Sequence, residues 1–263
     1  MTKLSSIFHA GGILARHRGV VNSATIDLAT EIRKGPPIWR PLLLLIAMTL
    51  AVRAGGVDLY WQHVFWSAES GWRFARNGAV QFLYHYGTWP ALLMGALSAL
   101  VWVYSQGKGA WESLQPLSLF LALLLVFGPG VLVNAIFKPH YGRPRPIDTR
   151  DFGGRETFRA IGEFGGKGKS FPSGHASMGF YWFGLFFYLW SRRRGLAWLF
   201  CGLGLLHGGL MGLGRMAQGG HWFTDVLWSA GFVYLTGWVL HRLLSAQTSP
   251  AAKPVASEIQ YSV

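Results

Sequence analysis

Apolar residues along this chain gather into six stretches that polar or basic segments separate. The stretches lie near residues 39–56, 79–105, 117–137, 176–190, 196–214 and 222–241. An α-helix needs about 20 apolar residues to cross a hydrocarbon core about 30 Å thick, and the better stretches approach that length. The pattern therefore predicts an all-α fold, an integral membrane bundle of six transmembrane helices over residues 38–244.

The first stretch is the poorest of the six, because Arg53 cuts its apolar run short. An arginine near the end of a membrane helix extends its charged group to the surface, which limits the length that lies in lipid. The segment 58–77 that follows is amphipathic and rich in aromatic residues. We expect that segment to lie at the membrane interface and not to cross it.

The composition favours a membrane protein over a soluble one. Of the 263 residues, 51% are hydrophobic and 13% are charged, whereas roughly 25% are charged in soluble domains. Too little charge remains to cover a soluble surface, so a membrane protein is indicated.

Basic residues in short loops predict the orientation of the helices, since such loops stay in the cytoplasm. The segment 1–37 is basic, "SRRRG" at 191–195 separates the fourth and fifth stretches, and basic residues follow the sixth. Six spans place all three on one side. We therefore expect segment 1–37 and a disordered tail at 245–263 in the cytoplasm. The size and compactness of the chain favour a bacterial inner (plasma) membrane.

The net charge of +13 is not confined to the cytoplasmic segments. The predicted extracytoplasmic loop between the third and fourth helices, residues 138–175, carries eight basic and four acidic residues. This excess runs against the usual bias of membrane proteins and indicates an anionic substrate. The expected partners are the membrane and an anionic lipid, not nucleic acid, and the oligomeric state stays open.

The stretch "GGKGKSFPSGHAS" at 165–177 begins like a nucleotide-binding loop. Such a loop has a glycine five residues before its Gly-Lys-Ser, but that position is Glu163 here. The strand and helix of a soluble α/β domain, which should flank the loop, are also not indicated. The stretch is therefore not interpreted as a nucleotide site.

Two blocks of this loop suit a phosphate group. In "KPHYGRPRP" (138–146), Lys138 follows the third stretch and Arg145 is held between prolines; ammonium and guanidinium groups both bind phosphate oxygens. In "FPSGHAS" (171–177), Ser173, Gly174 and the backbone N–H groups at the start of a helix form an anion site. His175 is placed there to donate a proton to a leaving oxygen.

The third block, "GRMAQGGHWFTD" (214–225), lies at the junction of the last two stretches. Arg215 closes the fifth stretch, and His221 and Asp225 are four residues apart, so they share one helical face. Asp225 can then accept a hydrogen bond from one imidazole nitrogen and leave the other free as a nucleophile.

The predicted topology places all three blocks on the outer face, where together they supply what phosphoryl transfer requires. That reaction needs cations on the phosphoryl oxygens, a nucleophile and a leaving-group acid. Two histidines and an aspartate also suggest a metal, but the cations Lys138, Arg145 and Arg215 would repel one. We predict no metal ligands and no cofactor.

The three blocks resemble those of the type 2 phosphatidic acid phosphatase (PAP2) superfamily, whose pattern is K-x6-RP, PSGH and SR-x5-H-x3-D. The resemblance covers roughly residues 117–242, and Gly214 departs from it where serine is usual. It implies six transmembrane helices and metal-independent hydrolysis through a phosphohistidine. It further implies a role for each matching residue. By this resemblance His221 is the nucleophile, Asp225 orients His221, and His175 is the acid. The implied phosphate ligands are Lys138, Arg145, Ser173, Gly174 and Arg215.

The substrate stays open at the level of sequence. Undecaprenyl diphosphate, phosphatidylglycerol phosphate and the phosphorylated disaccharide of lipid A all fit a basic site at a lipid surface. A phosphotransferase that passes phosphate to a second lipid is an alternative within the family. An anion transporter and a non-catalytic binder of anionic lipids are alternatives from other classes. The transporter predicts ionisable residues inside the spans, where only His85 and His207 are candidates.

Overall fold

The computed structural model describes residues 35–107 and 109–247. Gly35–His241 form one compact unit, which contains every residue predicted for the site. Of the predicted terminal segments, residues 1–34 and 248–263 lie outside the described residues.

Almost all regular elements are helices. Those of the first half are α2 (Trp39–Ala54), α3 (Val57–Phe65), α4 (Gly78–Tyr86), α5 (Trp89–Tyr104), the 3₁₀ helix η1 (Gly109–Leu114) and α6 (Gln115–Leu125). Those of the second half are the π-helix η2 (Val126–Phe137), α7 (Lys138–His140), the 3₁₀ turns η3 (Pro146–Asp148) and η4 (Arg150–Phe152), α8 (Gly174–Gly179), the 3₁₀ turn η5 (Phe180–Trp182), α9 (Phe183–Leu189), α10 (Arg194–Ala217) and α11 (Phe223–Gln247). A small antiparallel hairpin, β1 (Trp66–Ser67) with β2 (Gly71–Trp72), lies between α3 and α4.

Four helical segments among the described residues are long and apolar enough to cross a membrane. They are Gly78–Tyr104, Trp111–His140, Arg194–Ala217 and Phe223–Ser245. The pair α2 and α3 adds a fifth candidate if it counts as one span bent by 68°. The predicted stretch 176–190 is helical, but it consists of the short pieces α8, η5 and α9. The sequence prediction of a mainly helical chain with several membrane spans is confirmed.

Pro129 explains why the long segment Trp111–His140 contains a π-helical part. A proline has no N–H to donate to the preceding turn, so a regular α-helical ladder cannot pass through it. The helix widens there, and the side-chain amide of Asn134 donates to the carbonyl oxygen of Pro129 at 2.7 Å. The segment therefore continues unbroken to Lys138.

The outward surfaces of several helices are apolar. Leu44 on α2, Leu100 on α5 and Leu206 on α10 are 61%, 68% and 59% exposed. Large apolar side chains exposed in such numbers are unfavourable in water and typical of helices surrounded by lipid.

Glycines on α10 let two neighbouring segments approach its backbone. A Cβ atom at Gly208 would lie 2.4 Å from the ring of Phe180, and one at Gly212 would lie 2.2 Å from Val226. Small residues permit such close packing of membrane helices. The contacts fix η5 and α11 against α10, and so they place the start of α8 near the end of α10.

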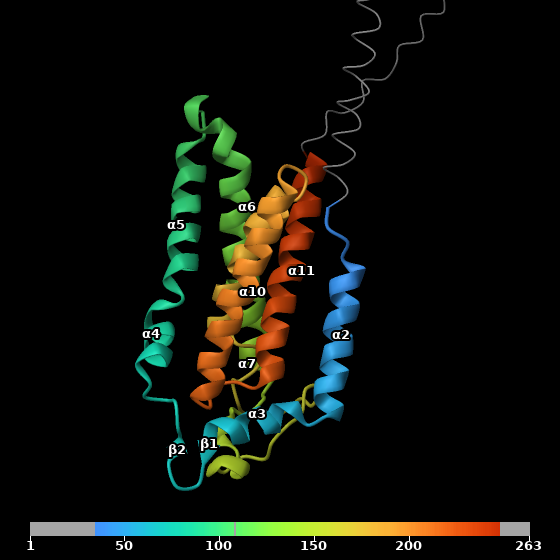
Figure 1. Cartoon of the computed structure of the whole chain (residues 1–263). Coiled ribbons are helices and arrows are strands. Elements are labelled where there is room, and N and C mark those ends of the chain that lie inside the picture. Colours follow the sequence, from blue (N-terminus) through green and yellow to red (C-terminus); the bar gives the residue numbers. More distant parts are fainter. Residues whose placement is uncertain (1–34, 108, 248–263) are drawn as a thin grey trace, which may run out of the picture. The chain divides into compact units, whose positions relative to one another are not determined.

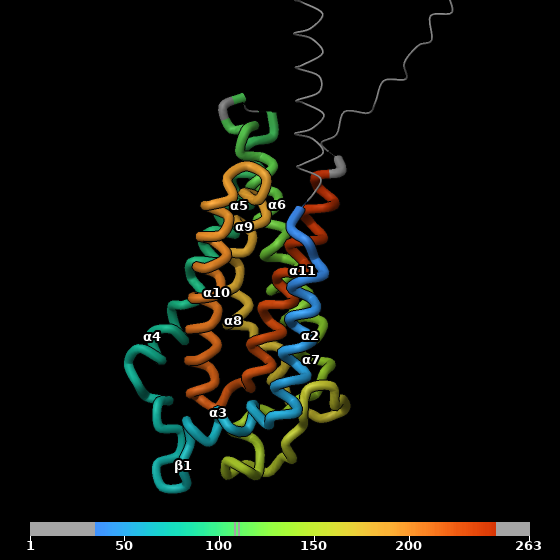
Figure 2. Tube along the Cα trace, turned by 45° about the vertical axis from the view of Figure 1, so that its right-hand side comes forward, coloured from blue at the N-terminus to red at the C-terminus, as the bar shows by residue number. Residues whose placement is uncertain are grey.

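The segment 141–173 folds back onto the helices through a buried cluster. Val133, Tyr141, Ile161, Phe171 and Phe232 form this cluster, with Phe137 and Trp228 packed against it. Figures 1 and 2 show this segment, α3 and the β1–β2 hairpin at one end of the helices, the lower end in both views. The predicted site lies at the same end.

Candidate active site

The three predicted blocks meet at the end of the bundle that the segment 141–173 covers. Their residues lie at the ends of four helical elements: Lys138 at the start of α7, Ser173 and Gly174 at the start of α8, Arg215 in the last turn of α10, and His221 and Asp225 around the start of α11. The charges of Lys138, Arg145 and Arg215 are close enough to repel one another. The fold thus places three cations beside one another, which is favourable once an anion lies between them.

Gly174 lies directly against Lys138. A Cβ atom at this position would lie 3.2 Å from Nζ of Lys138 and 2.6 Å from Oδ1 of Asn134. Ser173, fully buried, precedes the helix, and its Oγ accepts a hydrogen bond from the N–H of Ala176 at 3.4 Å. The backbone at Gly174 and the ammonium group of Lys138 can therefore approach the same anion only because residue 174 has no side chain.

His221 is 1% exposed, and a hydrogen bond to its backbone fixes its position. Its carbonyl oxygen accepts a hydrogen bond from Nε2 of Gln62 at 3.0 Å. Its Nδ1 lies 3.6 Å from Oδ2 of Asp225 and has no hydrogen-bond partner among the described residues. Burial lowers the pKa of His221 to about 4, although Asp225 acts to raise it. The imidazole is therefore neutral at pH 7, as a nucleophile must be.

Asp225 is fully buried, and three groups donate hydrogen bonds to its carboxylate. Oδ1 accepts from Nη1 of Arg143 at 2.6 Å, and Oδ2 accepts from Oγ of Ser170 and from the N–H of Trp222 at 2.9 Å. These donors favour the ionised carboxylate and fix its plane. Oδ2 is thereby held facing Nδ1 of His221.

Arg143 connects Asp225 to a second buried carboxylate. Its guanidinium is 0% exposed, and Nη2 donates to Oδ2 of Asp58 at 2.7 Å. Asp58, on α3, also accepts from the N–H of Thr224 at 2.9 Å and from its hydroxyl at 2.7 Å. An arginine fork suits two carboxylates better than a lysine does, because its donors lie in one plane with fixed directions. In this way α3 is tied to the start of α11.

Tyr84 of α4 lies between His175 and Arg215. The imidazole of His175 stacks on the tyrosine ring with centroids 4.9 Å apart and planes 13° apart, and Cζ of Arg215 lies 4.7 Å from the ring centroid. Burial, followed by the charges of Arg215, His221 and Lys138, lowers the pKa of His175 to about 4. Nε of Arg215 is buried without a hydrogen-bond partner among the described residues, so one donor of this guanidinium is available.

The sequence model of the PAP2 superfamily matches residues 116–249, about half of the chain. The chain belongs to the PAP2 superfamily. All eight predicted site residues lie inside the PAP2 match, and its first residue is one after the start of α6.

Three similar curated proteins are called lipid A 4'-phosphatase. The one from Francisella tularensis subsp. novicida (strain U112) is 41% identical over 128 residues, which are 48% of this chain and 57% of the relative. The one from Rhizobium leguminosarum is 35% identical over 152 residues, 56% of this chain and 61% of the relative. The one from Rhizobium etli is 34% identical over 152 residues, 56% of both chains. The matches thus span little more than half of each relative. No solved structure matches the chain.

The PAP2 motifs do not include all the residues that contact the predicted site. Asp58, Gln62 and Tyr84 precede the matched region, so the family pattern gives no signal for them. Arg143 lies inside the first block, two residues before Arg145, but the K-x6-RP motif specifies only Lys138 and Arg145. The sequence alone hardly distinguishes Arg143 from the other basic residues of the loop, because its role depends on two carboxylates that are distant in the chain.

Proposed function

We propose that this protein removes a phosphate group from a lipid A-type membrane lipid. The observation that carries the proposal is the meeting of His175, His221 and three cations at one end of the helices. The three relatives named lipid A 4'-phosphatase favour lipid A over the other two substrates that the sequence left open.

The proposed reaction begins with the phosphate between the three cations. Lys138, Arg145 and Arg215, with the backbone N–H groups at Ser173 and Gly174, bind the phosphoryl oxygens and stabilise the charge that they carry in the transition state. This role is consistent with the contact between Gly174 and Lys138 and with the available Nε–H of Arg215.

His221 then attacks phosphorus, and His175 protonates the oxygen that leaves. Because Nδ1 of His221 faces Asp225, we assign the attack to Nε2. The bond from phosphorus to the sugar oxygen breaks as the bond to Nε2 forms, which gives a phosphohistidine and the lipid alcohol. His175 is neutral in the free protein, and the negative charge of a bound phosphate raises the pKa of His175 so that it carries the proton.

Water completes the cycle. His175 takes a proton from a water molecule whose oxygen attacks the phosphohistidine, and inorganic phosphate leaves with His221 restored. Asp225 keeps His221 in one tautomer throughout, held in place by Arg143 and Ser170. The chemistry needs no metal and no cofactor.

In the proposed arrangement the site faces the periplasm. The bent pair α2–α3, the four long helices and the segment α8–α9 together make six spans in a bacterial inner membrane, with both termini in the cytoplasm. The apolar outward surfaces and the excess of basic residues in the loop 138–175 support this arrangement.

Phosphate release from a panel of lipids tests the function. Purified protein in detergent would be given an acylated disaccharide bisphosphate, undecaprenyl diphosphate and phosphatidylglycerol phosphate, with a chelator present. We expect release chiefly from the disaccharide, and a loss of roughly a thousandfold or more in His221→Gln. Loss of activity in chelator, or preference for another lipid, contradicts the proposal. Transfer of phosphate to an added lipid alcohol in place of water identifies a phosphotransferase.

A further inference from the structure

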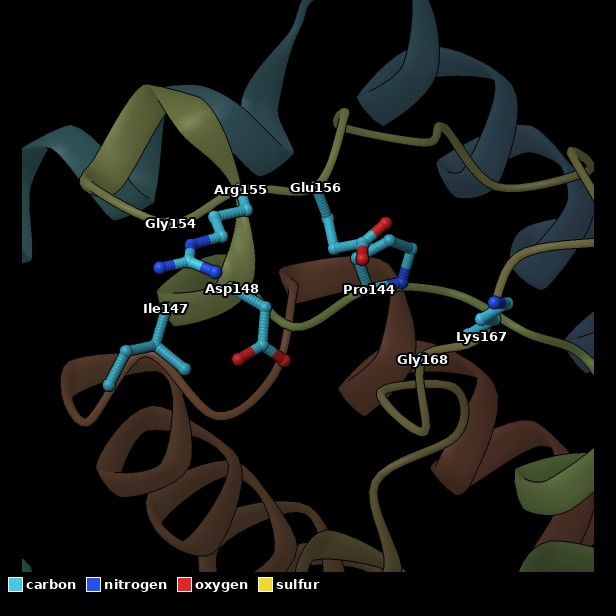
Figure 3. Close-up of a pocket in the computed structure, with 8 residues that line it drawn as sticks. All are labelled: Pro144, Ile147, Asp148, Gly154, Arg155, Glu156, Lys167 and Gly168. Atoms are coloured by element: carbon cyan, nitrogen blue, oxygen red, sulfur yellow. The ribbon is translucent and has the colours of Figure 1, made fainter.

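The segment 141–173 carries a cavity of about 350 Å³ that is open to the surface of the molecule. Its volume falls within the range of small-ligand sites, roughly 300–1,000 Å³. Figure 3 shows Ile147, Asp148 and Arg155 on one side of the cavity and Lys167 on the other, with Glu156 beside Pro144 between them. Two carboxylates and two cations therefore line the same hollow.

These four charged side chains are not paired with one another. In the part of the chain that the structure describes, the side chains of Asp148, Arg155, Glu156 and Lys167 make no hydrogen bond and no ion pair with other residues. Backbone hydrogen bonds hold three of these residues together in the chain, since the N–H groups of Arg155 and Glu156 both donate to the carbonyl oxygen of Asp148 at 2.8 Å. Charged groups that line a hollow and have no partner in the protein are available to a ligand.

The wall of the cavity is joined to the candidate active site. The carbonyl oxygen of Pro144 accepts a hydrogen bond from Nε1 of Trp222, the residue after His221, at 2.8 Å. The N–H of Ile147 donates to the carbonyl oxygen of Gly219 at 3.0 Å. Pro144 also lies between Arg143, which holds Asp225, and Arg145, a predicted phosphate ligand. The wall of the cavity is therefore bonded to the segment that leads into His221.

The charges indicate a neutral, hydroxyl-rich ligand. The two carboxylates balance the two cations, so the cavity has no excess positive charge with which to hold a second phosphate. Carboxylates accept hydrogen bonds from hydroxyl and amide groups, while Arg and Lys donate to ring, hydroxyl and carbonyl oxygens. Pro144 and Ile147 offer apolar surface to the C–H face of a ring. A sugar presents all three kinds of group within one ring.

We propose that this cavity binds the sugar ring that carries the phosphate to be removed. The proposal rests on the proposed function and deepens it, since it assigns the choice of a glycosyl phosphate over a simple alcohol phosphate to Asp148, Glu156, Arg155 and Lys167. Selectivity thus arises beside the phosphate site and not in the phosphate ligands themselves.

A selectivity measurement tests this role. The double variant Asp148→Asn/Glu156→Gln and the wild-type protein would be assayed for kcat/KM on the acylated disaccharide bisphosphate and on phosphatidic acid, which has a phosphate monoester but no sugar. We expect the ratio of the two values to fall by about tenfold or more in the double variant, because charged hydrogen bonds to sugar hydroxyls are lost. Asp151→Asn, an exposed acid of the same segment outside the cavity, is the matched control and should leave the ratio unchanged.

An unchanged ratio in an active double variant overturns the sugar site and leaves the proposed function intact. If the wild-type protein releases phosphate from no lipid, the proposed function fails, and a binding measurement decides on the cavity. For that measurement the acylated disaccharide without phosphate would be titrated into each protein in detergent, with diacylglycerol as comparison. Weaker binding of the disaccharide to the double variant alone supports the sugar site, and equal binding overturns it.

Discussion

Nη1 of Arg143 donates a hydrogen bond to Oδ1 of Asp225 at 2.6 Å, and neither side chain is exposed. The same guanidinium bonds Asp58, so one arginine holds two buried carboxylates. Removing one partner from such a network leaves a buried charge without compensation, which costs about 3–5 kcal/mol. The proposed partner of the nucleophile therefore depends on a residue that is not itself a phosphate ligand.

Arg143→Lys should lower both thermal stability and kcat. A lysine keeps the charge but cannot bond both carboxylates in their planes, so we expect kcat to fall by about tenfold or more with a smaller change in KM. Thermal unfolding and steady-state kinetics in detergent measure the two effects.

Glu163→Gln is the matched control, since it breaks the exposed ion pair between Arg53 and Glu163. The two side chains are 46% and 47% exposed, and such exposed pairs contribute about 0–1 kcal/mol to stability. Equal behaviour of the two variants contradicts the role of Arg143; if Arg143→Lys does not fold, the milder Asp58→Asn takes its place.

Tyr84→Leu should reduce turnover more than Tyr84→Phe does. The ring stacks on His175 and lies against Arg215, and ring stacking and cation–π contacts contribute roughly 0.5–2 kcal/mol each. We expect about a tenfold loss of kcat with leucine and near wild-type turnover with phenylalanine, which keeps the ring. Tyr86→Leu, on the same helix and 56% exposed, is the control. If Phe and Leu at position 84 lower kcat equally, the ring is not what positions His175.

Gly174→Ala should weaken the binding of phosphate. The added Cβ lies 2.6 Å from Oδ1 of Asn134 and 3.2 Å from Nζ of Lys138, so the ammonium group or the helix must shift. We expect kcat/KM to fall by about tenfold or more and inhibition by inorganic phosphate to weaken in parallel. Gly195→Ala, where a Cβ meets nothing within 4 Å, should leave both unchanged. Wild-type inhibition by phosphate in Gly174→Ala would show that residue 174 does not border the phosphate.

Activity should persist to an unusually acidic pH. Burial lowers the pKa of His221 to about 4, whereas an exposed histidine titrates near 6.5. The proposed nucleophile therefore stays neutral as the pH falls from 7 to 5, and its protonation should reduce kcat/KM only as the pH approaches about 4. The unfolded chain binds protons on this histidine between about pH 6.5 and 4 while the folded protein does not, so thermal stability should fall across that window. A kcat/KM profile whose acid limb lies near pH 6.5 contradicts the buried, neutral His221.

Much of the helical pattern is predictable from the sequence, because lipid demands long apolar runs. The expected stretch 79–105 corresponds to Gly78–Tyr104, and 117–137 lies within Trp111–His140. The division of 174–189 into α8, η5 and α9 is not predictable in this way. Hydropathy reports which residues are apolar, whereas the helix type depends on close contacts such as that of Phe180 with Gly208.

The predicted site residues were recognisable because their chemistry is encoded in short spacings, such as the four residues between His221 and Asp225. The contacts that hold them are not local. Asp58 accepts a hydrogen bond from Thr224, 166 residues away, and Tyr84 reaches His175 from another helix. A single sequence contains no spacing that joins such residues, so only the fold brings them together.

Trapping the covalent intermediate tests the central claim most directly. Protein in detergent would be mixed with lipid A-type substrate that carries a radiolabelled phosphate, quenched in alkali within the first turnover, digested and analysed by mass spectrometry. We expect acid-labile, alkali-stable label on the peptide that contains His221, at up to one phosphate per chain, and none in His221→Gln. Label on the peptide that contains His175, or full turnover by His221→Gln without any labelled peptide, would contradict it.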